Sequence, residues 1–190
     1  MQMKTLARSL ALRAFFFWAA LAGAAPSLAD EAAWKRIAQG GVTVLIRHAQ
    51  TEPGIGDPPG FKLGECSTQR NLSTEGRAQA RRLGEAFKAR GIATPRVLSS
   101  QWCRCIDTAR EAFGQATPEP ALNSFFGERR SAPGHTEAVR KLVAGVKPRA
   151  LLVLVTHQVN MTALTGEGAL QGEMLVLAPN GQLVGRISAP

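Results

Sequence analysis

The chain has 190 residues, of which 45% are hydrophobic, and carries a formal net charge of +9 at pH 7. This length suits a single domain with a sizeable core. The positive charge favours an anionic partner, such as a phosphate ester, an anionic lipid headgroup or nucleic acid. Nucleic acid is not expected, because the sequence has no basic run and no tyrosine, and because it opens with the features of an export signal.

Residues 1–29 predict a signal peptide. Three basic residues and no acidic residue accompany an apolar core at 14–24, and small residues suited to a signal peptidase end at Ala29. Cleavage there leaves one domain at 30–190, with 161 residues (190 − 29) and a charge of +6 (9 − 3). The apolar core is too short to span a bilayer well, so we predict no stable membrane insertion after cleavage and a periplasmic or secreted protein. A retained, uncleaved anchor is the alternative.

A buried strand is the first predicted element of the domain's sheet, after a short helix at 30–39. Residues 42–46 are β-branched and apolar, which is typical of a strand buried on both faces. The run ends abruptly at Arg47 and His48. Because ligands of open α/β sheets bind at the carboxyl ends of strands, Arg47 and His48 are candidate functional residues. Alternatively, the strand only surfaces at Arg47 and leaves His48 in a solvated turn.

The segment 52–65 is rich in glycine and proline, which predicts a loop over the site. Such loops often carry substrate contacts, and Lys62 is available here to an anionic group. A plain surface connection is the alternative.

A helix is predicted at 74–90, with Ser73 as its N-cap and Gly91 as its stop. On its inner face, Leu83 and Phe87 lie four residues apart.

A short strand at 96–100 leads into a helix at 101–113, and Arg104 falls in the first turn of this helix. Backbone N–H groups and the helix dipole favour an anion at that position, so Arg104 is a second candidate for binding phosphate. An ordinary salt bridge with Asp107 is the alternative.

A further helix at 135–146 precedes a second fully buried strand at 150–156, which ends directly at His157. Two core strands therefore end in histidine. The segments 172–177 and 182–187 predict a closing β-hairpin.

Three cysteines in an exported chain allow at most one internal disulfide, between Cys66 and either Cys103 or Cys105. Such a bond would stabilise the fold by ~3 to 4 kcal/mol in the chain-entropy model. Metal binding by the Cys-x-Cys pair is the competing interpretation. The pair lacks a second matched pair, so we predict no metal site.

These candidates suit the chemistry of a phosphate monoester. A dianionic phosphoryl group needs fixed cations, an in-line nucleophile and an acid for the leaving oxygen. Arg47, Arg104 and a protonated His157 can supply the cations. A neutral imidazole is available near neutral pH, so His48 can supply the nucleophile.

The segments LIRHAQT, NLSTEGRAQARRLG, SSQWCRCIDTA and LVTHQVN resemble, in order and spacing, the histidine phosphatase superfamily, also called the phosphoglycerate-mutase-like proteins. The resemblance implies a three-layer α/β/α sandwich around a mostly parallel central sheet. It also implies a phosphohistidine intermediate on His48, phosphate binding by Arg47 and Arg104, a supporting His157, no metal and no organic cofactor. We add Thr51, at the end of the first segment, to the candidate substrate-binding residues.

The sequence departs from the superfamily's pattern at two places. Ala49 and Gln50 follow the first histidine, where glycine and often glutamate are usual. Ser124 stands where many members have a glutamate, which leaves Glu128 as the nearest candidate general acid. Glu128 has an alternative role as a surface residue paired with a neighbouring arginine. With no carboxylate in reach, the enzyme would be slow on alkyl phosphates and would favour good leaving groups.

The sequence therefore predicts an exported phosphohydrolase that acts on a small phosphorylated substrate through a phosphohistidine on His48. The alternative is a non-catalytic domain of the cell envelope that binds a phosphorylated ligand with Arg47, Arg104 and His157. A disulfide-stabilised interaction module, in which His48 has no measurable role, is a third interpretation.

Overall fold

The computed structural model describes residues 28–92 and 95–190. The predicted signal peptide at 1–29 lies outside the described residues, apart from its last two positions. Within the described ranges, no helix has both the length and the apolar character needed to cross a membrane.

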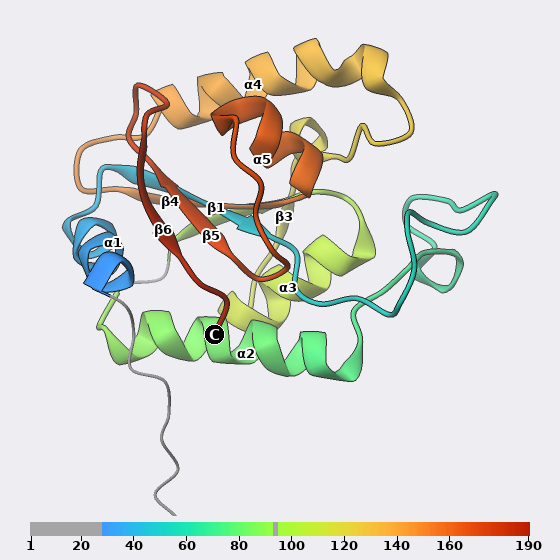
Figure 1. Ribbon diagram of the computed structural model, residues 1–190, viewed down its shortest axis with the longest axis horizontal. Helices are drawn as coiled ribbons and strands as arrows, with labels where there is room; N and C mark the ends of the chain where they lie inside the picture. Colours follow the sequence, from blue (N-terminus) through green and yellow to red (C-terminus); the bar gives the residue numbers. More distant parts are fainter. Residues whose placement is uncertain (1–27, 93–94) are drawn as a thin grey trace, which may run out of the picture.

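A single mixed sheet forms the centre of the described part of the chain (Figure 1). The strand order is β3-β2-β4-β1-β5-β6. The neighbours from β3 to β1 pair in parallel, whereas β5 pairs antiparallel with both β1 and β6. The strands are β1 (Val42–Arg47), β2 (Arg96–Ser99), β3 (Thr117–Pro118), β4 (Leu151–Thr156), β5 (Met174–Leu177) and β6 (Leu183–Ile187). The predicted strands and the closing hairpin are all present.

Helices cover both faces of this sheet, so the expected three-layer α/β/α class is confirmed (Figure 1). One face is covered by α1 (Leu28–Gln39), α2 (Thr74–Ala89) and α3 (Cys103–Phe113), and the other by α4 (Ala132–Ala144) and α5 (Gln158–Thr165). Short 3-10 turns are η1 (Cys66–Thr68), η2 (Pro120–Leu122) and η3 (Arg129–Ser131).

The side chains of β1 alternate between the two apolar cores. Val44 and Ile46 pack in the core beneath α1, α2 and α3, whereas Leu45 packs in the core beneath α4 and α5. Because both faces of the strand are buried, its sequence shows a continuous apolar run instead of a polar alternation.

The register between β1 and β4 positions the ends of both strands. Arg47 lies opposite Thr156, and the backbone N–H of His48 donates to the Thr156 carbonyl at 3.0 Å. Since the two strands are parallel neighbours, His48 and His157 emerge side by side at one edge of the sheet.

The start of α2 packs directly against the segment that follows His48. Ser73 caps this helix, as predicted, by accepting a hydrogen bond from the Gly76 backbone N–H at 3.0 Å. The Ser73 N–H in turn donates to the Gln50 carbonyl. A Cβ at Gly76 would collide with that carbonyl oxygen, so this close approach requires glycine.

Candidate active site

A cavity of about 620 Å³ lies at the carboxyl ends of β1 and β4. Four side chains predicted from the sequence line it together: Arg47, His48, Arg104 and His157. The structure thus brings together residues separated by up to 110 positions (157 − 47), at the sheet edge where parallel strands place their ligands.

His48 is held as a neutral imidazole. Its side chain is buried, and Nδ1 lies 2.9 Å from the Ala49 carbonyl oxygen, which can only accept, so Nδ1 carries the proton. Burial lowers the pKa of His48 to about 3, and the positive charges of Arg104 and Arg47 act in the same direction. The Nε2 lone pair is therefore available at neutral pH.

His157 lies beside His48, with 5.5 Å between the ring centroids. Its Nε2 is 2.8 Å from Ser100 Oγ, and the Ser100 hydroxyl donates to Asn123 Oδ1 at 3.2 Å. Asn123 Oδ1 also accepts from the Gln101 backbone N–H, which fixes the orientation of the amide. Ser100 therefore accepts from Nε2–H, and Nδ1 of His157 holds the lone pair.

The prediction that His157 serves as a cation toward a phosphate stays a prediction, and in the free site the surroundings of His157 oppose protonation. Burial lowers the pKa of His157 well below 6.5, and the positive charges of Arg104 and Arg47 act in the same direction. The free site therefore favours a neutral His157 ring.

Arg47 and Arg104 each bury a donor without a partner. Arg47 Nη1 donates to Gln158 Oε1 at 2.6 Å and to the Ala169 carbonyl at 2.7 Å. Within the described residues, however, neither Arg47 Nε nor Arg104 Nε has a hydrogen-bond partner. Buried donors are usually satisfied, and both arginines line the cavity, so a bound oxyanion is a fitting acceptor.

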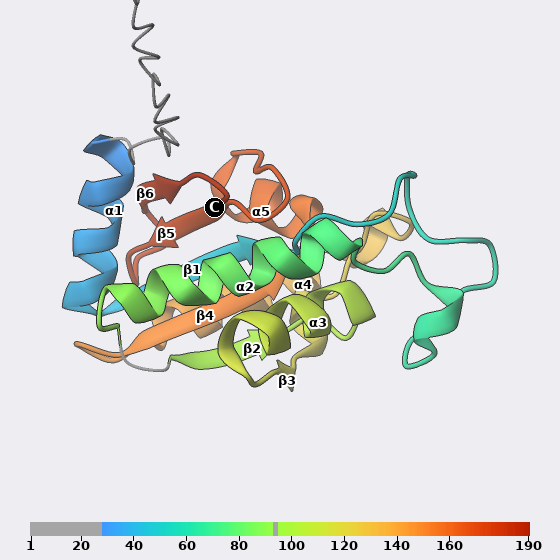
Figure 2. The same ribbon diagram turned by 90° about the horizontal axis from the view of Figure 1, so that it is seen from below.

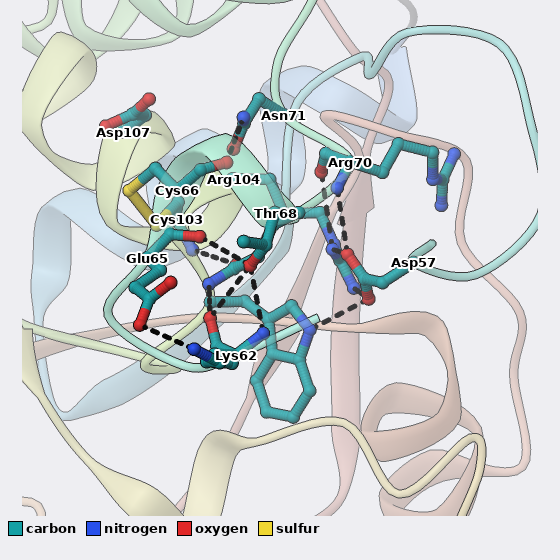
Figure 3. Close-up of a disulfide and its surroundings, with 12 residues drawn as sticks. Asp57, Lys62, Glu65, Cys66, Thr68, Arg70, Asn71, Cys103, Arg104 and Asp107 are labelled. Atoms are coloured by element: carbon teal, nitrogen blue, oxygen red, sulfur yellow. Dashed lines mark hydrogen bonds and ion pairs between the residues drawn. A yellow bond between two sulfur atoms is a disulfide. The ribbon is translucent and has the colours of Figure 1, made fainter. Parts of the chain in front are cut away.

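Asp57 holds Arg104 in a two-pronged ion pair that the sequence did not predict (Figure 3). Arg104 Nη1 donates to Oδ1 at 2.6 Å and Nη2 donates to Oδ2 at 3.1 Å, while Trp102 Nε1 donates to Oδ2 at 2.9 Å. Burial opposes ionisation of Asp57, but the hydrogen bonds from Arg104 and from the Arg70 backbone outweigh it and lower its pKa. The proposed alternative pair with Asp107 does not form, since Asp107 accepts from Arg77 instead.

Arg70 also lines the cavity, and sequence reasoning missed it. Its Nη1 donates to Thr51 Oγ1 at 2.6 Å and to the Gly54 carbonyl at 2.9 Å, and its Nε donates to the Gly56 carbonyl at 2.8 Å. The local pattern around Arg70 is that of an ordinary loop. The charge of the expected ligand could have indicated a further arginine, because a phosphate dianion calls for more cations than the strand ends provide.

Thr51 supports Arg70 and is not among the described residues that line the cavity. Its hydroxyl oxygen is buried and accepts from Arg70 and, at 3.1 Å, from Gln171 Nε2. We therefore assign Thr51 to the support of the arginine cluster.

The structure does not bring Lys62 or Glu128 to the cavity. Lys62 is exposed, and its Nζ lies 3.3 Å from a Glu65 carboxylate oxygen (Figure 3). Glu128 is also exposed, on the turn before η3, whereas the cavity is lined in this region by Ser124 and Phe126. The same turn therefore places Phe126 at the cavity and Glu128 outside it.

A disulfide joins Cys66 to Cys103 and so settles the pairing left open by the sequence (Figure 3). It ties η1 to the first residue of α3, directly before Arg104. Because Cys103 is in this bond, the Cys-x-Cys pair does not form a dithiol metal site. Cys105 remains a thiol, and burial raises its pKa to about 12.

A model of one protein family matches the part of the chain that carries most of this site. The model of the histidine phosphatase superfamily (branch 1) matches residues 43–131, a range that contains Arg47, His48 and Arg104. The resemblance to this superfamily is thereby confirmed for the range that contains the first three sequence segments, whereas LVTHQVN lies outside it. No curated protein matched the chain in a sequence search.

Solved structures with the same fold cover most of the chain. The protein histidine phosphatase SixA complexed with tungstate is 19% identical, with a TM-score of 0.55, over 78% of this chain and 97% of that one. Phosphoglycerate mutase from Thermus thermophilus is 20% identical, with a TM-score of 0.55, over 78% and 99%. A mycobacterial glucosyl-3-phosphoglycerate phosphatase with bound VO3 is 20% identical, with a TM-score of 0.53, over 72% and 92%. At these identities the likeness establishes the fold.

Proposed function

We propose that this protein is an exported phosphohydrolase that cleaves a phosphate monoester, or a related phosphoryl compound, through a phosphohistidine intermediate on His48. The observation that carries the proposal is the convergence of a neutral, buried imidazole with Arg47, Arg70 and Arg104 on one cavity. The superfamily match supports phosphohydrolase activity. Export rests on the sequence of residues 1–29, and the disulfide suits an oxidising compartment.

His48 Nε2 attacks phosphorus in the first step, so that an N–P bond forms and the bond to the leaving oxygen breaks. The proton on Nδ1 stays hydrogen-bonded to the Ala49 carbonyl, which keeps the reacting nitrogen unprotonated. The guanidinium groups of Arg47 and Arg104, which line the cavity, stabilise the charge on the non-bridging oxygens. In the second step water attacks phosphorus, the N–P bond breaks, and inorganic phosphate leaves.

The leaving group must depart without help from a nearby acid. Among the described residues, no aspartate or glutamate lines the cavity. The leaving oxygen therefore takes its proton from water, and the rate should depend steeply on the pKa of the leaving group. Acyl, aryl and nitrogen-linked phosphoryl compounds are the favoured substrates. This preference fits the name of one structural neighbour, a protein histidine phosphatase.

Rapid mixing with ³²P-labelled acetyl phosphate, followed by a quench, tests the proposal. We expect a phosphoryl adduct that is stable to base and labile to acid, and we expect His48→Ala to lose both the adduct and phosphate release. The matched control is His135→Ala, which removes a histidine bound to the Ala121 carbonyl outside the cavity and should retain both signals. Phosphate release by His48→Ala at the wild-type rate would refute the mechanism.

A non-catalytic phosphate-binding domain is the second candidate function. It is favoured by the same lack of a carboxylate among the described residues that line the cavity and by the ion pair with Asp57 that partly neutralises Arg104. This candidate predicts that tungstate binds, that Arg47→Ala abolishes this binding, and that no phosphate is released from acyl, aryl or phosphoramidate substrates.

A further inference from the structure

Apolar side chains stand exposed around the mouth of the cavity. Ile55, Phe126 and Leu170 line it, yet 91%, 55% and 71% of their respective surfaces are exposed. They come from three separate segments: the loop after β1, the turn after η2 and the segment after α5. A single exposed apolar residue needs no explanation, but a cluster of them around a charged pocket marks a binding surface.

The loop after β1 extends this apolar surface. In Figure 2 the loop stands out from the body on the side to which the β1 arrow points. Phe61 on this loop is partly exposed and packs against Trp102, with 5.6 Å between ring centroids, and Trp102 packs edge-on against His157 at 5.4 Å. Ring contacts therefore run from the exposed loop through the buried Trp102 to His157.

The uncharged polar side chains of the cavity are partly engaged within the protein. Gln158 Oε1 accepts from Arg47, Gln171 Nε2 donates to Thr51, and Ser124 Oγ accepts from the Phe126 backbone N–H. Each of these side chains, among the described residues that line the cavity, thus already has a partner in the protein. The charged and titratable groups of the cavity are the arginines and histidines, which serve the phosphoryl group.

We infer that the substrate is a phosphomonoester with an apolar aryl leaving group, such as an alkylated aryl phosphate. The arginine cluster binds the phosphoryl group, and Ile55, Phe126 and Leu170 bury the apolar part of the leaving group. The inference rests on the proposed function and adds the class of substrate to it.

Phenyl phosphates with para-methyl, para-ethyl, para-propyl and para-butyl groups test this inference, because the added methylenes leave the pKa of the phenol almost unchanged. All are used below their critical micelle concentration. We expect kcat/KM to rise about two- to fourfold for each methylene, where fourfold corresponds to the ~0.8 kcal/mol of one buried methylene. Phosphotyrosine, which carries a charged para substituent, should fall below the para-butyl compound.

Variants of the exposed apolar residues at the cavity mouth show whether these side chains cause the increase in kcat/KM. Ile55→Ser and Leu170→Ser should each flatten the ratio of kcat/KM for the para-butyl substrate over that for phenyl phosphate. Because the ratio is taken within one variant, a loss of folded protein or of phosphate affinity cancels. The matched control is Val184→Ser on β6, which changes another exposed apolar residue away from the cavity and should keep the wild-type ratio.

The outcomes separate this inference from the proposed function. No phosphate release from any substrate, acetyl phosphate included, refutes the proposed function. Release that is independent of chain length, or fastest with phosphotyrosine, overturns the inference alone.

Discussion

Burial controls the chemistry of the histidine pair. His48 and His157 lie next to each other and next to the arginine cluster, so a proton on either ring costs more than in water. The free site therefore keeps His48, the proposed nucleophile, neutral without a dedicated base. A bound phosphoryl dianion reverses part of this cost, since its negative charge favours an imidazolium.

The lowered pKa of His48 predicts that stability falls in acid. As the pH drops below 6.5, the unfolded imidazole takes up a proton while the folded one, with a pKa of about 3, does not. The free energy of unfolding should therefore decrease by about 2 kcal/mol between pH 6.5 and 4.5 from this residue alone. Urea unfolding of wild type and His48→Gln at both pH values measures this, and equal losses in the two proteins would contradict it.

Asp57 is a positioning residue for Arg104. Asp57→Asn removes a negative charge near the bound anion, so tungstate should bind about tenfold more tightly. The same change weakens the hydrogen bonds that hold the Arg104 guanidinium, so kcat should fall about tenfold. The matched control is Glu65→Gln, which removes an exposed carboxylate from the same loop and should change neither quantity.

Isothermal titration with tungstate and steady-state kinetics provide the two measurements for Asp57→Asn. A parallel weakening of tungstate binding and of kcat would point to general damage and would contradict the positioning role.

The sequence revealed the site residues that follow buried strands. Arg47, His48 and His157 stand out because a long apolar run stops where each of the two strands ends. Asp57 and Arg70 were not predicted, because loop residues find their partners through contacts distant in sequence, and no local periodicity marks them.

At the scale of elements, the packing of α2 against α3 determines where Arg104 lies. Arg77 on α2 bonds to Asp107 and Glu111 on α3. Gly84 on α2 approaches α3 so closely that a Cβ would collide with the Ala112 carbonyl oxygen. The backbones of the two helices are therefore in direct contact at Gly84 and Ala112.

Gly84→Ala should destabilise the protein by about 2 kcal/mol, because the clash with the Ala112 carbonyl outweighs the ~1 kcal/mol gain in helix propensity. Gly134→Ala is the matched control: this glycine lies in α4 with no atom within contact distance of a new Cβ, so the protein should gain ~0.5 to 1 kcal/mol. Urea unfolding measures both changes, and a stabilised Gly84→Ala would refute the close contact.

Most elements followed from local signals, and the exceptions have physical causes. The N-cap at Ser73 and the buried face of α2 predicted that helix almost to the residue. The eight-residue helix α5 was missed because it is too short for an apolar period to emerge. The two-residue strand β3 exists only through its pairing with β2, which no local pattern encodes.

At the scale of the whole molecule, the Cys66–Cys103 bond links the long loop to the helical layer. Asp57 and Arg70 also attach the loop, through their bonds with Arg104 and with each other (Figure 3). The sequence limited the disulfide partner of Cys66 to Cys103 or Cys105. In the fold the partner is Cys103, the first residue of α3.

Cys66→Ser should lower the free energy of unfolding by about 4 kcal/mol, because the unfolded chain regains the freedom that a closed loop of this length removes. Guanidinium unfolding of the variant and of wild type measures the difference. Wild type treated with a reductant is the internal control and should match the variant. A loss below ~1 kcal/mol would show that the unfolded chain gains little from opening the bond.

The position of this bond has a practical consequence for handling the protein. Dithiothreitol is often added to protect a free thiol, but Cys105 needs no protection, since burial raises its pKa to about 12 and keeps the sulfur unreactive. The same reagent would cut the link one residue before Arg104 and release the loop that carries Asp57. Purification and assay buffers should therefore be free of thiols.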